Sequence, residues 1–236
     1  MTKGSRLPFE SAVATGRGDD GTTGLLYGGE RIAKDDPRAE AYGTVDEAVA
    51  ALGLARADLG LKERYGARSP SFGTLDETIL RLQRELFVVG AELATNPAAT
   101  DRLEPGRTRV SAEMVEGLGR LLVDLEAHVA MPREFVVPGE TRVSATLELA
   151  RTVVRRAERR AVTLQRSGLL PEGSHVLPYL NRLADLVWIL ARAAEQAESR
   201  TARPARSAKV HAARATVADT ASKPDAVHPS DAPGRS

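Results

Sequence analysis

Two segments of the 236-residue sequence carry residue types that suit the binding of a polyphosphate. A glycine-rich run near the start reads Thr15-Gly-Arg-Gly-Asp-Asp-Gly-Thr-Thr23, and an arginine-rich run spans residues 151–160. The backbone N–H groups of a glycine-rich loop can cradle anionic oxygens, and guanidinium groups on a helix supply opposing positive charge. Together the two segments predict a clamp for a phosphate chain, whereas either alone is weak evidence.

The glycine-rich run matches two known phosphate-binding patterns only in part. The stretch from Gly16 to Gly21 has the glycine spacing of the dinucleotide fingerprint, but no apolar strand precedes it and no helix follows directly. A P-loop is also excluded, because Thr22 and Thr23 follow without a lysine. What remains is a flexible loop whose hydroxyl, carboxylate and guanidinium groups suit phosphate and its bound cation. An ordinary surface loop is an equally good interpretation of this run by itself.

The arginine-rich run places charged side chains on one face of a helix. Residues Arg151, Arg155, Glu158 and Arg159 fall at i, i+4, i+7 and i+8. Their mutual repulsion calls for an anionic ligand or acidic partner, although a solvated helix balanced by Glu158 explains the pattern equally well. Nucleic acid is disfavoured, since no aromatic residues interleave with the arginines and the net charge is only +1.

Polar residues also interrupt two helices that are otherwise apolar. Asn181 and Asp185 lie one turn apart among Leu, Val and Ile residues, which favours a hydrogen-bonded lock between helices over a ligand contact. Asp46 interrupts an earlier helix in the same way. A buried or interfacial carboxylate there requires a cationic partner, for which Arg151 is a candidate.

The composition limits the class of protein. Hydrophobic residues make up 42% of the chain, enough for a real core and one domain with tails. The chain has no cysteine, which rules out disulfides and thiolate chemistry. We find no signal-peptide core and no apolar run long enough to span a bilayer, so a cytoplasmic protein that does not contact membrane is expected.

Hydrophobic periodicity and capping residues predict five helices and no convincing set of strands. A loose lead (1–14) precedes a polar loop (15–36) with at most one short strand, and an apolar hinge runs from Phe135 to Gly139. The tail (201–236) has almost no large apolar side chains and is predicted to be disordered. The predicted fold is an all-α five-helix bundle, with its helices at residues 37–59, 74–95, 111–130, 141–166 and 174–199.

Five motifs in a fixed order carry a resemblance that extends from about Thr15 to Arg192. The chain resembles the PduO-type ATP:cob(I)alamin adenosyltransferases, a family of corrinoid adenosyltransferases. The resemblance implies a domain over residues 15–200 with ferritin-like up-down helices, a homotrimer with active sites between subunits, and transfer of the 5′-deoxyadenosyl group of ATP to Co(I) with release of triphosphate. The motifs are TGRGDDGTT, GGERIAKDDPRAEAYGTVDE, FVVPG, ARTVVRRAERR and YLNRLADLVWILAR.

The resemblance also assigns residues to the nucleotide. The loop 15–36 would fold over ATP, with magnesium held mainly by phosphate oxygens, and Arg155 would clamp the triphosphate as charge develops on it. Asn181 would line the nucleotide site, supported by Asp185. The nucleotide residues implied in this way are Thr15, Gly16, Arg17, Gly18, Asp19, Thr23, Lys34, Arg155, Arg156, Glu158, Arg159 and Asn181.

On the corrinoid side, the resemblance implies that Phe135 sits beneath the corrin and excludes the lower axial ligand, which makes reduction to Co(I) easier. Asp46 and Arg151 would form an intersubunit ion pair. A corrinoid reductase and an adenosylcobalamin-dependent mutase are the implied partners. The alternatives are a non-catalytic cobalamin carrier or ATP-sensing relative on the same bundle, and a plain helical scaffold whose arginine face meets an acidic partner.

The sequence departs from the family pattern at four positions. Gly16 stands where a basic residue is usual, and Arg17 stands where threonine is usual. Glu140 replaces a second glycine after the proline, and Glu148 occupies a place where histidine is frequent. These departures predict a nucleotide loop that uses a shifted guanidinium and a corrinoid affinity that differs from that of the family.

Overall fold

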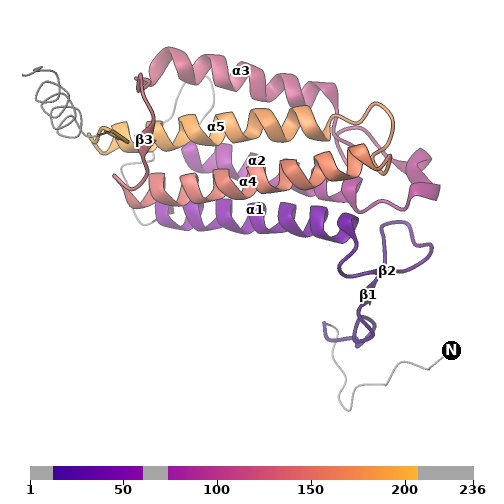
Figure 1. Cartoon of the computed structure of the whole chain (residues 1–236). Coiled ribbons are helices and arrows are strands. Elements are labelled where there is room, and N and C mark those ends of the chain that lie inside the picture. The colour runs from indigo at the N-terminus through magenta and orange to yellow at the C-terminus, as the bar shows by residue number, and fades with distance from the viewer. Residues whose placement is uncertain (1–12, 61–73, 207–236) are drawn as a thin grey trace, which may run out of the picture.

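The computed structural model describes residues 13–60 and 74–206, and its α-helices lie side by side in a bundle (Figure 1). The expected helical class is confirmed, and the bounds of the helices differ from the predicted ones by only a few residues. A short 3-10 helix, η2 (Pro97–Arg102), lies between the second and third α-helices. The α-helices of the described residues are α1 (Pro37–Gly60), α2 (Leu75–Leu93), α3 (Ala112–His128), α4 (Arg142–Arg166) and α5 (Val176–Ala197).

Local side-chain bonds explain where the helices begin. Thr74 and Glu77 form the predicted capping box of α2, in which the Thr74 hydroxyl accepts from the Glu77 amide at 3.1 Å and the Glu77 carboxylate accepts from the Thr74 amide at 2.9 Å. Thr141 caps α4 in a similar reciprocal arrangement with Ser144. Each cap satisfies amides that the helix itself leaves without partners.

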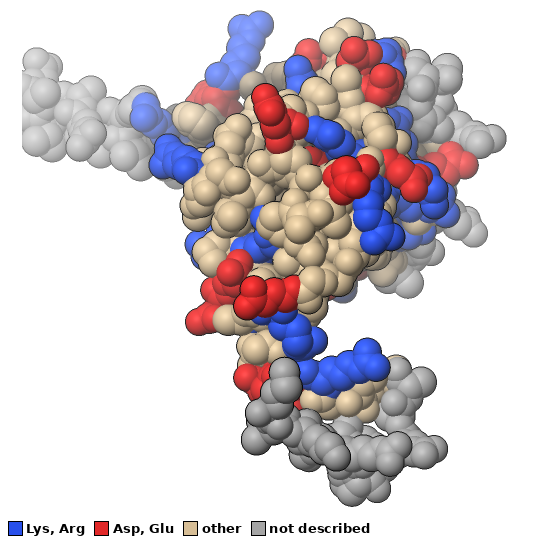
Figure 2. Space-filling view, turned by 90° about the vertical axis from the view of Figure 1, so that its right-hand side faces the viewer, with Lys and Arg blue, Asp and Glu red and all other residues tan. Residues whose placement is uncertain are grey.

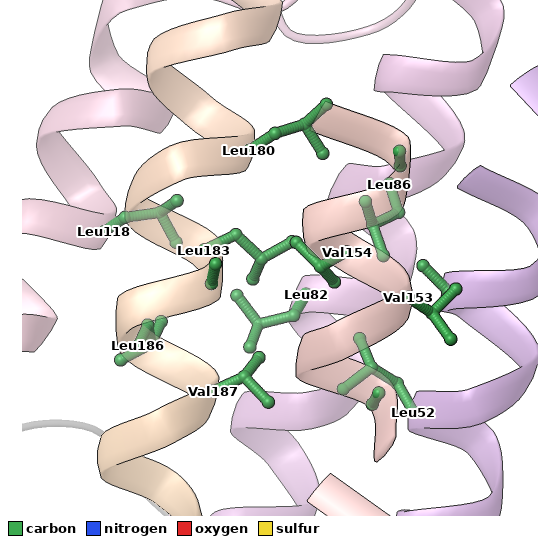
Figure 3. Close-up of a cluster of buried hydrophobic side chains, with 14 of the residues drawn as sticks. Leu52, Leu82, Leu86, Leu118, Val153, Val154, Leu180, Leu183, Leu186 and Val187 are labelled. Carbon is green, nitrogen blue, oxygen red and sulfur yellow. The ribbon is translucent and has the colours of Figure 1, made fainter. Parts of the chain in front are cut away.

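The core lies between the helices and receives side chains from all of them. Helix α1 packs against α2 and α4, and α5 packs against α3 and α4. Figure 3 shows Leu52 of α1, Leu82 of α2, Leu118 of α3 and Leu183 of α5 among the fully buried side chains. Each such side chain contributes roughly 1.5–3 kcal/mol by leaving water. The bundle therefore provides a rigid frame on which the charged faces of α4 and α5 are held.

A small hairpin precedes α1. Strand β1 (Thr22–Thr23) pairs antiparallel with β2 (Ile32–Ala33), and the hairpin projects beyond one end of the bundle (Figure 1). The sequence predicted at most one short strand here, because a strand of two residues has no period that a pattern can reveal.

A second pair of strands corrects the predicted start of the disordered tail. Strand β3 (Val136–Val137), directly after Phe135, pairs antiparallel with β4 (Arg203–Pro204). Composition alone predicted disorder from residue 201, but backbone pairing orders this stretch without large apolar side chains. Most of the predicted lead and the predicted tail from residue 207 lie outside the described residues. Within the described ranges, no helix has both the length and the apolar character required to cross a membrane.

Candidate functional site

Helix α4 carries arginines along two edges, and α1 neutralises one of them. Arg156 pairs with Glu47, and the Arg160 Nε lies 3.0 Å from a carboxylate oxygen of Glu40. These contacts hold α4 antiparallel to α1. Arg156, which the resemblance assigned to the nucleotide, therefore lies with Arg160 on the edge of α4 that faces α1.

The other edge of α4 keeps its positive charge exposed. Arg155 is exposed and has no ion pair with any residue in the described part of the chain, while Arg159 donates to the Arg155 backbone carbonyl at 3.0 Å. Glu158, half-buried, lies on the turn between them. Arg155 lines a cavity of about 310 Å³ whose walls come from α3, α4 and α5. A ligand in this cavity would meet the Arg155 guanidinium on one wall and the Glu126 and Asp185 carboxylates on the others.

The polar pair on α5 does not form the predicted lock. Both side chains are exposed, and Asp185 lines the same cavity as Arg155. Among the described residues, neither the Asn181 nor the Asp185 side chain forms a hydrogen bond to another helix. The structure therefore places the Asp185 carboxylate near the arginine edge of α4, and it leaves the Asn181 amide accessible from outside the chain.

A larger cavity of about 770 Å³ lies next to the first, and Phe135, the residue that the resemblance places beneath the corrin, lines it. Phe135 is 90% exposed, so its ring is free to contact a ligand or a second copy of the chain. Arg151 and Trp188 line both cavities, so the two are neighbours. The structure thus brings Phe135, Arg151 and Arg155 to two adjoining cavities of one chain.

A buried ionic network lies beneath this surface. The carboxylate of Glu148, 4% exposed, accepts from Arg151 Nε at 2.7 Å and from Arg192 Nη1 at 3.1 Å. Arg192 also donates to Glu195 at 2.8 Å, and its guanidinium lies 5.6 Å from the Trp188 ring. Charges this deeply buried persist only when they are paired. Glu148 therefore fixes the orientation of Arg151.

Asp46 and Arg151, the predicted ion pair, do not meet within one chain. Asp46 is exposed on α1, and the Arg151 guanidinium is turned toward Glu148. Among the described residues, no ion pair joins Asp46 to any cation. A pair between Asp46 and Arg151 would thus require a second copy of the chain.

The glycine-rich loop is shaped by contacts with the hairpin. Arg31 donates to the Thr22 hydroxyl at 2.7 Å and to the Arg17 carbonyl at 2.8 Å. The Lys34 ammonium lies 3.0 Å from where a Cβ on Gly18 would stand, so a larger residue at position 18 would crowd Lys34. The loop therefore gathers Gly18, Lys34 and the hydroxyl of Thr22 on one small surface.

The carboxylate of Asp20 supports the turn of this loop. It accepts from the Thr22 hydroxyl at 2.7 Å and from the Thr22 amide at 2.9 Å, and these hydrogen bonds lower the pKa of Asp20. Gly16 and Gly21 have φ of 67° and 78°, in the region that favours glycine. Asp19 and Arg17 are exposed on the same loop, as is Thr15.

The loop and the Phe135 cavity lie at opposite ends of the bundle (Figure 1). The hairpin precedes the first turn of α1, while β3 precedes the first turn of α4, which runs antiparallel to α1. Figure 2 shows Lys and Arg side chains where the projecting segment leaves the bundle. A single chain thus presents the parts of the predicted site but does not close them around one ligand.

Sequence reasoning missed several residues of this site. Arg31 shapes the glycine-rich loop, Trp188 joins the two cavities, and Arg206 lines the larger one. The signal for the buried network was present in the sequence, because Glu148 precedes Arg151 by three residues and Arg192 precedes Glu195 by three. No local sequence pattern could have shown that Arg206 lines the same cavity as Phe135.

Comparison with known proteins points to one family. Residues 13–194 match the family model described as cobalamin adenosyltransferase. A corrinoid adenosyltransferase from Citrobacter freundii is 38% identical over 78% of this chain and 94% of its own length. A corrinoid adenosyltransferase from Mycobacterium bovis is 39% identical over 77% of this chain and 88% of its own length.

Solved structures give the same result. A variant of the PduO-type ATP:corrinoid adenosyltransferase from Lactobacillus reuteri, complexed with cobalamin and ATP, has a TM-score of 0.70 and 28% sequence identity to this chain. The match covers 82% of this chain and 96% of that structure.

Proposed function

Since this chain belongs to the cobalamin adenosyltransferase family, we propose that it transfers the 5′-deoxyadenosyl group of ATP to cob(I)alamin at a site completed by a second copy of the chain. One observation carries the shared site: the glycine-rich loop and the Phe135 cavity lie at opposite ends of the bundle (Figure 1). A second copy can bring its loop to the first copy's arginine edge, and three copies close such head-to-tail contacts into a homotrimer.

In the reaction, the Co(I) electron pair attacks C5′ of ATP, a Co–C bond forms, and the C5′–O bond breaks with its electrons passing to triphosphate. The reaction needs no protein nucleophile. Arg155 suits the leaving group, because its exposed guanidinium has no ion pair in the described part of the chain and stands beside a cavity. Positive charge fixed there stabilises the transition state more than the ground state.

The Phe135 cavity suits the corrinoid. Its volume of about 770 Å³ is in the range of pockets for large ligands, and its wall contains the Phe135 and Trp188 rings. An exposed phenyl ring beneath the corrin leaves no donor atom for the lower axial position. The Arg151 guanidinium, held by Glu148, would pair with Asp46 of the neighbouring copy at the boundary between nucleotide and corrinoid.

Magnesium enters this proposal with ATP. The described residues contain no group of three or more His, Asp or Glu side chains arranged to hold a metal ion. Phosphate oxygens would supply most of the ligands, and the exposed carboxylate of Asp19 lies on the loop that would cover them. A reductase that supplies the electron for Co(I), and a mutase that takes the product, are the expected partners.

Turnover under anaerobic conditions tests the proposal directly. Purified protein is mixed with ATP, magnesium and chemically reduced cob(I)alamin, while the corrinoid spectrum and the released triphosphate are followed. We expect adenosylcobalamin and triphosphate in equal amounts. Binding of ATP and cobalamin by folded protein without either product would instead identify a non-catalytic carrier or sensor.

A further inference from the structure

The segment that follows α5 returns to the Phe135 cavity. Strand β4 pairs with β3, and the Ala205 amide donates to the Phe135 carbonyl at 2.7 Å. The Arg203 guanidinium pairs with the carboxylate of Glu140. The C-terminal partners in these contacts, residues 203–205, lie beyond residues 13–194, which the family model matches. The hinge that carries Phe135 is thus held from the C-terminal side by residues that follow the range matched by the family model.

The same contacts account for one departure from the family pattern. Glu140 stands where a glycine is common, and its side chain is 13% exposed beneath Arg203. A glycine at this position would offer no carboxylate to Arg203. Glu140 therefore serves to bind Arg203, and this ion pair helps to hold the C-terminal segment against the hinge.

The segment also contributes to the wall of the cavity. Ala205 and Arg206 line it together with Phe135, Arg133 and Arg151. Arg151 is already paired with Glu148, whereas Arg206 lies on the wall formed by the returning segment. If Phe135 covers the lower face of the corrin, the displaced nucleotide tail of cobalamin leaves from that face. Its phosphodiester carries one negative charge, which suits a guanidinium.

We propose that residues 203–206 form a clasp on the corrinoid pocket. The clasp fixes the Phe135 hinge through β3–β4 and the Arg203–Glu140 pair, and it directs Arg206 to the phosphodiester of the corrinoid's nucleotide tail. This inference rests on the proposed function, because it takes a corrinoid as the ligand of the Phe135 cavity. It predicts that the clasp affects the affinity for the corrinoid and leaves the affinity for ATP unchanged.

The chain's single tryptophan provides a readout that does not depend on turnover. Trp188 lines the Phe135 cavity, so a bound corrinoid, which absorbs at the wavelengths of tryptophan emission, quenches its fluorescence. We expect Arg203→Glu, which places two carboxylates together, to raise the Kd for cobalamin by about tenfold, the factor that corresponds to 1.4 kcal/mol. The double variant Glu140→Arg with Arg203→Glu restores the pair and should recover most of the affinity.

Arg206→Ala tests the contact with the phosphodiester. It should weaken the binding of cobalamin but not that of cobinamide, which lacks the phosphodiester and the nucleotide. Arg200→Ala is the matched control, because Arg200 is exposed on the same connection and lines a different cavity. Equal weakening for both corrinoids would overturn the contact between Arg206 and the phosphodiester.

The clasp and the proposed function fail in different ways. If the wild-type chain turns over and Arg203→Glu binds cobalamin with unchanged affinity in folded protein, the clasp is wrong and the activity stands. If cobalamin does not quench the Trp188 fluorescence of the wild-type chain and no adenosylcobalamin forms, both the proposed function and the clasp are wrong.

Discussion

At the scale of single residues, the Glu148 carboxylate bridges two arginines, Arg151, which has no other ion pair among the described residues, and Arg192, which also pairs with Glu195. Arg192 is almost fully buried, and Arg151 reaches from the same carboxylate to both cavities. A neutral histidine at position 148, frequent in the family, could not balance these two cations. This chain therefore uses a fixed negative charge to orient the arginine at the boundary of the proposed site.

Replacing Glu148 should therefore cost both stability and activity. Glu148→Ala leaves the buried Arg192 with one fewer partner, and we expect the free energy of unfolding to fall by about 3–5 kcal/mol. Urea denaturation measures this loss. Glu116→Ala removes the exposed pair with Arg120, where both side chains are more than half exposed, and should cost less than about 1 kcal/mol. Similar losses for the two variants would show that the Glu148 network does not stabilise the fold.

Replacing Phe135 should lower activity without lowering stability, because its exposed ring does not pack in the core. We expect Phe135→Ala to keep the midpoint of unfolding and the affinity for ATP. The variant should slow adenosylation of Co(II) supplied with a reductant, because the lower axial position is no longer shielded. An assay with chemically prepared Co(I) is the control, and a smaller defect is expected there. Unchanged rates in the reductant-coupled assay would remove the argument from axial-ligand exclusion.

Residue types and spacing predicted only part of this site. The i, i+4 spacing placed Arg151 and Arg155 on one edge of α4, and the structure brings both to the surface that carries Phe135. The pair between Arg156 and Glu47 was not predicted, because the two residues lie 109 positions apart in the sequence. Contacts between such distant residues have no local signature, and the same holds for the return of Arg206.

At the scale of elements, a buried hydroxyl links α5 to α2. The Tyr179 O–H donates to Glu85 at 2.9 Å, and Glu85 also accepts from Arg81 at 2.7 Å. Burial and the nearby carboxylate raise the pKa of Tyr179 well above its usual value of 10.0. The protonated hydroxyl is thus the form that the fold requires.

This raised pKa predicts a loss of stability in alkali. The unfolded chain releases the Tyr179 proton near pH 10, while the folded chain retains it, so the stabilisation is complete below pH 10 and declines as the pH rises further. Tyr179→Phe should cost about 1 kcal/mol at pH 7 through the lost hydrogen bond. The difference from wild type should narrow at higher pH. Urea denaturation at pH 7 and pH 10.5 tests this, and a constant difference would contradict the assignment.

The elements themselves were more predictable than their connections. Apolar periodicity and the caps at Thr74 and Thr141 mark the helices, because both signals are local in sequence. Arg38, in contrast, is buried and donates to carbonyls of Leu93, Thr95 and Leu169, so it joins three segments that no pattern connects. Strand pairing between β3 and β4 was missed for the same reason.

At the scale of the whole molecule, the separation of the glycine-rich loop from the Phe135 cavity means that one chain does not close the proposed site by itself. Helix α1 alone, with 24 residues, spans roughly 36 Å at 1.5 Å per residue. A loop attached at one end of such a bundle cannot cover a cavity at the other end. The proposed trimer resolves this by letting each copy supply a loop to its neighbour.

Mixed oligomers give a direct test of this arrangement. Lys34→Ala in the loop and Arg155→Ala on α4 should each keep the trimer and abolish turnover. When the two variants are mixed in equal amounts while unfolded and then refolded together, about a quarter of the sites should pair an intact loop with an intact Arg155, restoring activity in that proportion. If both groups act within one chain, every site keeps a defect and the mixture stays inactive.

The hairpin adjoins the bundle through a short stretch of main chain near Asn96. The Asn96 side chain donates to the Gly28 carbonyl, and it packs so closely on Gly29 that any Cβ there would overlap it. Beyond this anchor the hairpin projects from the bundle, with Arg17, Arg31 and Lys34 accessible to trypsin. The rate of cleavage at these three positions therefore reports whether nucleotide is bound. ATP should slow cleavage there, while the core of the bundle resists digestion with or without ATP.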